Sequence, residues 1–172
     1  AIFEESPFIF RQSKIVEVAE KTKDSITVNI HDENACPRYA ARIIKNVKVG
    51  PSPDWLKARL LSIGQKSINN IVDAANFVLM DTGHPMHTFD LAKIKSKSIN
   101  IRYAQNGEKF TTLDNVEREL KDFHLLICDG SAPIALGGIM GGANSQIADS
   151  TTDILIESAY FKPTVIRKGA KR

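Results

Sequence analysis

A glycine-rich run, Gly137-Gly138-Ile139-Met140-Gly141-Gly142, is the feature that most restricts how this chain can fold. It lies between apolar segments of a length typical of buried strands. Glycine loses more conformational entropy on folding than any other residue, so such a run needs a structural or functional reason. One interpretation is a tight turn between strands. The other is a pocket wall, where missing side chains leave room for a ligand.

A second unusual segment is the loop Gly83-His84-Pro85-Met86-His87-Thr88-Phe89-Asp90, which follows a helical pattern. Pro85 between the two histidines argues against a helical metal pair, and no third ligand lies at a familiar spacing, so we expect no metal site. We interpret His87 as a positioned hydrogen-bonding group, tuned by Asp90 or Asp73. A loop histidine with a purely structural role is the alternative.

Composition limits the class of protein. The chain has 172 residues, of which 42% are hydrophobic, which is enough for one domain with a full core. Aromatic residues make up 7%, which argues against a base-stacking platform, and a net charge of +3 is only weakly indicative of a polyanionic partner. Cys36 and Cys128 lie far apart and are interpreted as buried thiols in a reducing compartment. No apolar run approaches the roughly 20 residues of a membrane span, so we expect a cytoplasmic protein.

Two helices are expected in the first half. Ser52 is a suitable N-cap for a helix with Pro53 in its first position, and this helix would end near Gly64. Its core face would carry Leu56, Leu60 and Ile63.

The second helix is expected to start after Ser67, to run to about residue 81 and to stop at Gly83, with an apolar stripe that begins at Ile68. Asn69, Asp73 and Asn76 share one face of it as a narrow polar seam. A seam that faces solvent needs no explanation. One that faces inward must be hydrogen-bonded, and the loop that follows the helix would be the obvious partner.

The rest of the chain is mostly strand-like, with a last helix expected over residues 164–172. The strand-like segments are 26–30, 38–49, 99–103, 111–113, 116–120, 125–128, 134–140 and 154–157. Asp114-Asn115 is a plausible hairpin turn. Two helices followed by many strands predict an α+β domain, a sheet sandwich flanked by helices.

Glu157 is the third candidate site residue. Strand alternation places it on the same face as Leu155, with Ile154 and Ile156 on the other face. Both faces carry apolar residues, so Glu157 either faces solvent or is buried and paired. The sequence lacks a nucleophile elbow and a distinctive Cys–His pair, so an enzyme built on this chain would orient a water molecule.

A set of motifs then resembles a known family. In chain order they are CPRY at 36–39, SPDWL at 52–56, NIVDAANFV at 70–78, GHPMHTFD at 83–90, GE at 107–108, TLD at 112–114, GIMGGANS at 138–145 and IESAYFKP at 156–163. Together they resemble the editing and tRNA-binding module of the beta subunit of bacterial phenylalanyl-tRNA synthetases. The resemblance covers residues 36–172 and makes residues 1–35 a lead-in from a preceding region.

The resemblance implies a three-layer α+β fold around a β-sandwich of unusual topology. It implies hydrolysis of tyrosine mis-attached to tRNA(Phe), in a full synthetase that works with an alpha subunit, ATP and magnesium. No cofactor site is expected on this chain itself. The expected partners are tRNA(Phe) and the alpha subunit, without a membrane or DNA.

The resemblance also assigns roles to individual residues. Glu157 would read the tyrosyl hydroxyl, and Gly141, with Gly142, would leave room for the ring. His87 would position the water or the ester carbonyl. Asn76 would hold the amino-acid end of the substrate or the terminal ribose. The attacking water would be assisted by a ribose hydroxyl of the substrate.

Lys171 and Arg172 are the candidate contacts to tRNA phosphates. The chain departs from the family at Ala75, where many relatives have threonine, and the Thr-Asp-Ala segment that completes the pocket lies beyond Arg172. We therefore expect a module truncated at its C-terminal end. Two alternatives stay open: a non-catalytic tRNA-docking or scaffold domain of the same synthetase, and an unrelated small-molecule-binding domain that uses the glycine run.

Overall fold

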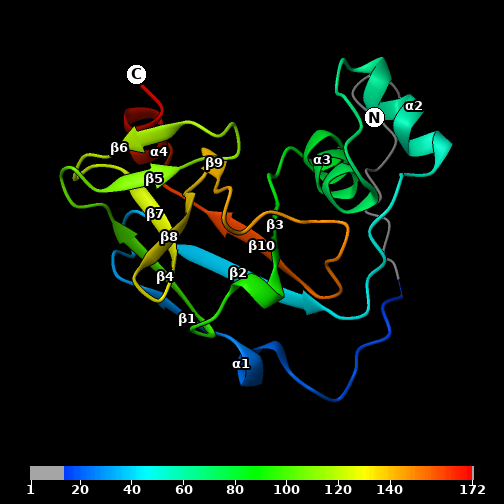
Figure 1. Cartoon of the computed structure of the whole chain (residues 1–172), viewed down its shortest axis with the longest axis horizontal. Coiled ribbons are helices and arrows are strands. Elements are labelled where there is room, and N and C mark those ends of the chain that lie inside the picture. The colour runs from blue at the N-terminus through cyan, green and yellow to red at the C-terminus, as the bar shows by residue number, and fades with distance from the viewer. Residues whose placement is uncertain (1–13, 172) are drawn as a thin grey trace, which may run out of the picture.

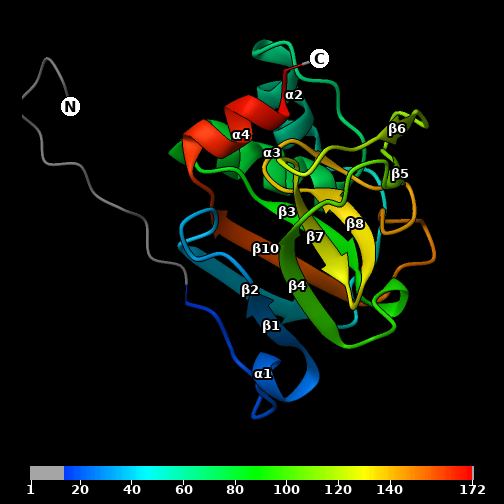
Figure 2. The ribbon, with the colours of Figure 1, turned by 90° about the vertical axis from the view of Figure 1, so that its left-hand side faces the viewer.

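Two β-sheets face each other and a two-stranded hairpin covers the outside of the larger one, in a computed structural model that describes residues 14–171 (Figures 1 and 2). The larger sheet has the order β1 (Thr27–Ile30), β4 (Ser98–Tyr103), β7 (Leu125–Asp129), β8 (Ala132–Leu136) and β9 (Met140–Gly141). The smaller sheet has the order β2 (Arg38–Ile44), β10 (Ile154–Tyr160) and β3 (His87–Asp90). The hairpin consists of β5 (Lys109–Thr111) and β6 (Glu117–Glu119).

The helices lie outside the sheets. They are α1 (Thr22–Ser25), α2 (Asp54–Ser62), α3 (Asn70–Thr82), the 3-10 helix η1 (Leu91–Lys93) and α4 (Pro163–Gly169). Helix α2 contacts α3, and α3 contacts β3, the edge strand of the smaller sheet. No helix within residues 14–171 is long and apolar enough to cross a membrane. The α+β class and the sandwich expected from the sequence are confirmed.

The main core lies between the two sheets. Ile99 and Ile101 on β4 and Ile127 on β7 meet Phe89 on β3 and Leu155 on β10, and all five are at most 1% exposed. Because apolar side chains on alternate positions of a strand share one face, these residues form a continuous layer between the sheets. This layer fixes the position of β3 and β10, the two strands that carry the candidate site.

Strand β7 is buried on both faces. Leu125 and Ile127 face the main core, whereas Leu126 and Cys128 face a second cluster with Phe110 of the hairpin. A strand covered on both sides must be apolar throughout, which explains the unbroken run that the sequence shows there. Cys128 is fully buried and unpaired, as expected.

Helix α3 has clear boundaries. The Asn69 side chain accepts hydrogen bonds from the backbone amides of Ile71 and Val72, at 3.1 and 2.9 Å. The helix ends at Gly83, whose φ of 74° is the left-handed conformation that favours glycine. The start after residue 67 and the stop at Gly83 are both confirmed.

The polar seam of α3 points inward at Asp73, but its partners differ from those expected. The Asp73 carboxylate, which is fully buried, accepts hydrogen bonds from the Ser52 hydroxyl at 2.5 Å and the Ser67 hydroxyl at 2.6 Å, and from the Ile68 amide at 2.8 Å. Burial raises the pKa of this carboxyl, but the three hydrogen bonds outweigh it and lower the pKa overall. The partners therefore precede the helix, and the loop after the helix supplies none of these three bonds.

Ser52 was expected to cap α2, and this prediction is wrong. Pro53, which has no side-chain acceptor, occupies the N-cap position, and the Ser52 hydroxyl donates to Asp73 instead. Ile63 and Ile68 were expected on core faces but are 46% and 66% exposed, since they lie just outside the helices. Leu56 and Leu60 are buried as expected.

Candidate functional site

The two candidate residues His87 and Glu157 lie on neighbouring strands. The antiparallel register of β3 and β10 places His87 directly opposite Glu157. Side chains at directly opposed positions share a face of the sheet, so the imidazole and the carboxyl are immediate neighbours. Seventy residues of sequence separate them, and the β3–β10 pairing brings them together.

These two side chains are the titratable groups of a small cavity. It has a volume of about 170 Å³ and is walled mainly by apolar groups, among them Met86, Ile139, Met140 and Phe161. Pockets for drug-sized ligands are typically about 300–1,000 Å³. The cavity is therefore sized for one side chain of a ligand.

Glu157 is buried, with 6% of its surface exposed. The Tyr39 hydroxyl lies 3.4 Å from its Oε2 atom and donates a hydrogen bond. Burial raises the pKa of Glu157 to about 8, although the Tyr39 hydrogen bond acts in the opposite direction. The prediction that Glu157 and Leu155 share a face is confirmed, and of the two expected environments the buried one is correct.

His87 is held against Phe89 in an edge-to-face contact, with ring centroids 4.5 Å apart. Burial lowers the pKa of His87 to about 4, so the imidazole is neutral at physiological pH. Within residues 14–171 its ring nitrogens have no hydrogen-bond partner, yet neither is sealed from the cavity. A neutral imidazole offers one donor and one acceptor to a ligand.

The expected tuning of His87 by Asp90 or Asp73 is wrong, because both carboxylates have other partners. Asp90 instead accepts hydrogen bonds from the Thr151 hydroxyl at 2.8 Å and from the Ala92 amide at 3.0 Å. Asp73 is held by Ser52 and Ser67, as described above. Burial alone sets the pKa of His87.

Gly141 forms the wall of the cavity next to His87. A Cβ atom at Gly141 would lie 2.7 Å from the Cε1 atom of His87 and 2.8 Å from its Nε2 atom. A side chain there would therefore displace the imidazole from its observed position. Gly138, with a φ of 65°, makes the turn between β8 and β9. The glycine run thus serves both as a turn and as a pocket wall.

Gly142 has a different role. A Cβ atom there would lie 2.6 Å from the Asn144 side-chain oxygen and 2.7 Å from the carbonyl oxygen of Ile134. It is not among the residues that line the cavity. The structure explains Gly142 by close packing, and its assignment to the substrate site stays a prediction.

The remaining candidates lie elsewhere. Asn76 is partly buried on α3 and does not line the cavity. Lys171 is exposed just after α4, and Arg172 lies outside the described residues. The Nε2 atom of His84 lies 3.0 Å from the Ser158 hydroxyl, so the two loop histidines have separate surroundings. Residues 14–171 contain no group of three or more potential metal ligands.

Tyr39 was missed as a site residue in the sequence analysis, where it served only as part of a motif. The available signal was the alternation along β2, in which the odd-numbered residues from 39 to 43 face inward. That pattern predicts a partly buried phenol but not its partner, because the partner depends on how β2 pairs with β10.

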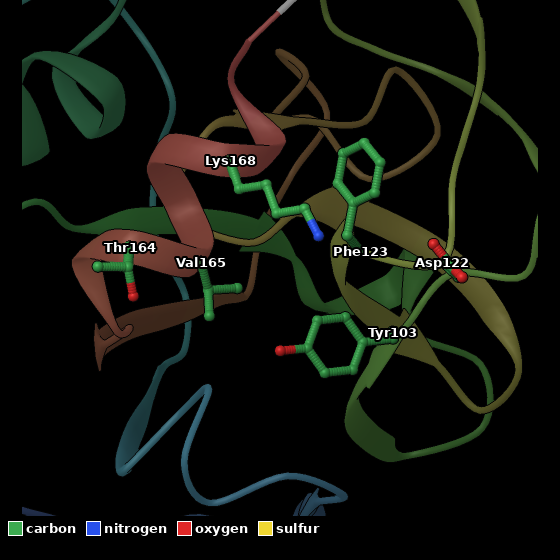
Figure 3. Close-up of a pocket in the computed structure, with 6 residues that line it drawn as sticks. All are labelled: Tyr103, Asp122, Phe123, Thr164, Val165 and Lys168. Atoms are coloured by element: carbon green, nitrogen blue, oxygen red, sulfur yellow. The ribbon is translucent and has the colours of Figure 1, made fainter.

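A larger hollow of about 470 Å³ lies between α4, the end of β4 and the segment that joins β6 to β7 (Figure 3). Lys168 from α4 extends over the ring of Phe123, with its Nζ atom 4.6 Å from the ring centroid. Tyr103 and Asp122 also line it, but it contains none of the residues singled out for chemistry. The smaller cavity is therefore the candidate site.

A family model described as "B3/4 domain" matches residues 35–172. The chain belongs to the B3/4 domain family. This B3/4 domain is 52% identical over 153 residues to the phenylalanine–tRNA ligase beta subunit of Syntrophotalea carbinolica, covering 89% of this chain and 19% of that protein. It is 53% identical over 149 residues to the corresponding subunit of Protochlamydia amoebophila, covering 87% of this chain and 19% of that protein. The chain spans about a fifth of the length of these relatives.

A solved structure supports the fold of this B3/4 domain. An N-terminal fragment of the phenylalanyl-tRNA synthetase beta subunit from Pyrococcus horikoshii superimposes with a TM-score of 0.62 at 17% identity, covering 87% of this chain and 47% of that one. These similarities confirm the resemblance to synthetase beta subunits seen in the sequence. The boundary expected at residue 36 stays a prediction, while β1 pairs in parallel with β4 in the larger sheet.

Proposed function

We propose that this B3/4 domain is the editing module of a phenylalanyl-tRNA synthetase beta subunit and hydrolyses tyrosine mis-attached to tRNA(Phe). The observation that supports this most is the pairing of His87 and Glu157 across adjacent strands, in a cavity sized for one side chain. One group can recognise the amino acid, and the other can act on its ester.

The need for such a site follows from the chemistry of phenylalanine and tyrosine. An apolar synthetic pocket rejects an analogue that merely adds a hydroxyl by a factor on the order of a hundred. A buried carboxyl reverses the selection, because the tyrosyl hydroxyl gives it a partner and phenylalanine does not. An unsatisfied buried polar group costs roughly 1–3 kcal/mol. Glu157 is a buried carboxyl with apolar cavity walls around it, and only its Oε2 atom has a partner within residues 14–171, the Tyr39 hydroxyl.

Hydrolysis would use a water molecule with no covalent intermediate. His87, neutral and with ring nitrogens that have no hydrogen-bond partner within residues 14–171, lines the cavity and would position that water or the ester carbonyl. Gly141 leaves the space between the imidazole and the ligand ring. A ribose hydroxyl of the substrate would assist the attack. Asn76, outside the cavity, would contact only the parts of the substrate that remain outside it.

The wider assembly belongs to the same proposal. The partners would be tRNA(Phe) and the synthetase alpha subunit, with Lys171 and Arg172 near tRNA phosphates. ATP and magnesium would serve the full synthetase, and we assign no residue of this chain to either.

A non-catalytic docking domain is the alternative, favoured by the exposed Arg167, Lys168 and Lys171 near the end of the chain. Release of tyrosine from Tyr-tRNA(Phe) by the assembled synthetase separates the two functions. Editing predicts release that His87→Ala and Glu157→Ala both impair. Unchanged release in both variants would refute the catalytic assignment, and no release by the unmodified synthetase would favour docking.

A further inference from the structure

Tyr39 is a neighbour of Glu157 on the adjacent strand β2. Strand β2 pairs with β10 so that Ala41 lies opposite Glu157 and Tyr39 lies opposite Ala159. Tyr39 is thus the next inward-facing residue of β2 after the one opposite Glu157. From there the Tyr39 hydroxyl reaches the Oε2 atom of Glu157 at 3.4 Å. Tyr39 packs against the main core and does not line the cavity. It can therefore act on a ligand only through Glu157.

The two carboxyl oxygens of Glu157 have different surroundings. Oε2 has the Tyr39 hydroxyl as its partner. Oε1 has no hydrogen-bond partner within residues 14–171. Every fully buried side-chain oxygen in these residues has a partner, so Oε1 must keep some exposed surface. Because Glu157 lines the cavity, the exposure that Oε1 retains is exposure to the cavity. One oxygen is thus fixed by the protein, and the other is left for a ligand.

The other groups around the carboxyl bring no charge to it. The Cys36 thiol is fully buried, and burial, followed by the proximity of Glu157, raises its pKa to about 11. His87, across on β3, is neutral because burial lowers its pKa to about 4. Burial and then Glu157 raise the pKa of Tyr39 well above its ordinary value, so it keeps its proton and donates.

We propose that Tyr39 is a positioning residue that holds the Oε2 atom of Glu157 and so presents Oε1 to the hydroxyl of a bound tyrosyl group. This proposal rests on the proposed editing function and adds a specificity-determining residue to it. Burial raises the pKa of Glu157, and the phenol donor lowers it in part, so Tyr39 increases the fraction of the ionised carboxylate, which is the better acceptor for a second phenol. Tyr39 thereby acts on both the direction and the protonation of Glu157.

The test is a Tyr39→Phe variant of the assembled synthetase that carries this chain, which removes one oxygen atom and keeps the ring. The readout is kcat/KM for deacylation of Tyr-tRNA(Phe) divided by that for Phe-tRNA(Phe). The ratio should fall roughly three- to tenfold, the range for one lost hydrogen bond. Tyr103→Phe is the matched control, because Tyr103 packs against the same core but lines the other hollow. Its ratio should not change.

Two further readouts separate positioning from a general loss of packing. The Tyr39 hydrogen bond lowers the pKa of Glu157, so in Tyr39→Phe the pH midpoint of the selectivity ratio should move upward. In a Glu157→Gln background, Tyr39→Phe should change the ratio no further, because its effect passes through Glu157.

An unmodified enzyme that releases tyrosine selectively, together with an unchanged ratio and midpoint in Tyr39→Phe, would refute the role of Tyr39 and leave editing intact. Full additivity of the two substitutions would refute it as well. An unmodified enzyme that releases no tyrosine would overturn both proposals.

Discussion

Glu157 and His87 are cross-strand neighbours, and burial favours the neutral form of both side chains by shifting their pKa values in opposite directions. Burial raises the pKa of the Glu157 carboxyl to about 8 and lowers the pKa of the His87 imidazole to about 4. At neutral pH the imidazole carries no charge and the carboxyl is largely protonated, so the pair is not a salt bridge. The pair therefore brings no charge to the cavity, which suits the apolar ring of the proposed tyrosyl ligand.

Glu157→Ala should remove the preference for tyrosine. Without a carboxyl to satisfy, the cavity gains nothing from the ligand hydroxyl, so the selectivity ratio for Tyr-tRNA(Phe) over Phe-tRNA(Phe) should fall by roughly five- to a hundredfold. Steady-state deacylation of the two esters measures this ratio. Glu119→Ala, an exposed glutamate on the hairpin, is the control. A ratio that stays the same in Glu157→Ala would remove the recognition role.

Gly141→Ala should impair tyrosine release, because the new methyl group would lie 2.7 Å from the His87 ring and would displace it. Deacylation of Tyr-tRNA(Phe) should drop by at least tenfold, while aminoacylation with phenylalanine is retained. The matched control is Gly50→Ala, since Gly50 has open space around it and no left-handed backbone. Full activity of Gly141→Ala would contradict the placement of the ligand ring beside His87.

The stability of the chain should depend on pH through both groups. Glu157 has a raised folded-state pKa, so its contribution is present at low pH and is lost as pH rises toward about 8. His87 has a lowered folded-state pKa, so its contribution is present above its ordinary value of 6.5 and is lost as pH falls toward about 4. Between about 4.5 and 6.5 the two trends oppose each other.

Above pH 6.5 Glu157 is the one of these two groups that dominates the pH dependence of the free energy of unfolding. From pH 6.5 to 8 the free energy of unfolding should fall by roughly 1–1.5 kcal/mol, because the slope decreases from its full value of about 1.4 kcal/mol per pH unit as the pKa is approached. Urea denaturation of the chain at both pH values measures it. In Glu157→Gln, which cannot ionise, the fall should disappear. A fall of the same size in Glu157→Gln would assign the pH dependence to other groups.

Asp73→Ala should destabilise the fold without touching the cavity. It would leave the Ser52 and Ser67 hydroxyls and the Ile68 amide without their buried acceptor, at a cost of about 1–3 kcal/mol in the free energy of unfolding. Chemical denaturation measures this loss. Asp54→Ala, at an exposed position on α2, should cost much less. Equal losses in the two variants would argue against the importance of the buried network.

The basic C-terminal segment should contribute to tRNA affinity through phosphates. In the assembled synthetase, replacing both Lys171 and Arg172 by alanine should weaken tRNA(Phe) binding and reduce the slope of log K against log salt by about two. Filter binding over a range of salt concentrations measures it. Lys66→Ala, an exposed lysine between α2 and α3, should leave the slope unchanged. An unaltered slope in the double variant would exclude these residues from the tRNA contact.

Much of the fold was readable from local patterns. The alternation of Ile99 and Ile101 predicted β4, and the alternation of Leu155 and Glu157 predicted which side chains of β10 share a face. Gly83 ended α3 because its left-handed backbone is a local requirement. Such features depend on a few consecutive residues, so the sequence suffices for them.

Features that depend on distant partners were not readable. Ser52 satisfies the rules for an N-cap, but a buried carboxylate 21 residues away takes its hydroxyl. The resemblance brought His87 and Glu157 into one proposal, yet their adjacency depends on the pairing of β3 with β10. The role of Tyr39 was not predicted for the same reason. Its partner Glu157 lies on β10, 118 residues away in the sequence.

The two-residue spacing of His87 and Phe89 on β3 also determines where the chain tolerates an insertion. Phe89, with no exposed surface, anchors a strand whose side chains alternate between two faces. Lengthening residues 83–86 by one leaves that anchor in place, so the imidazole still meets the carboxyl. Inserting one residue between His87 and Phe89 instead turns the imidazole to the opposite face of the sheet, away from the cavity.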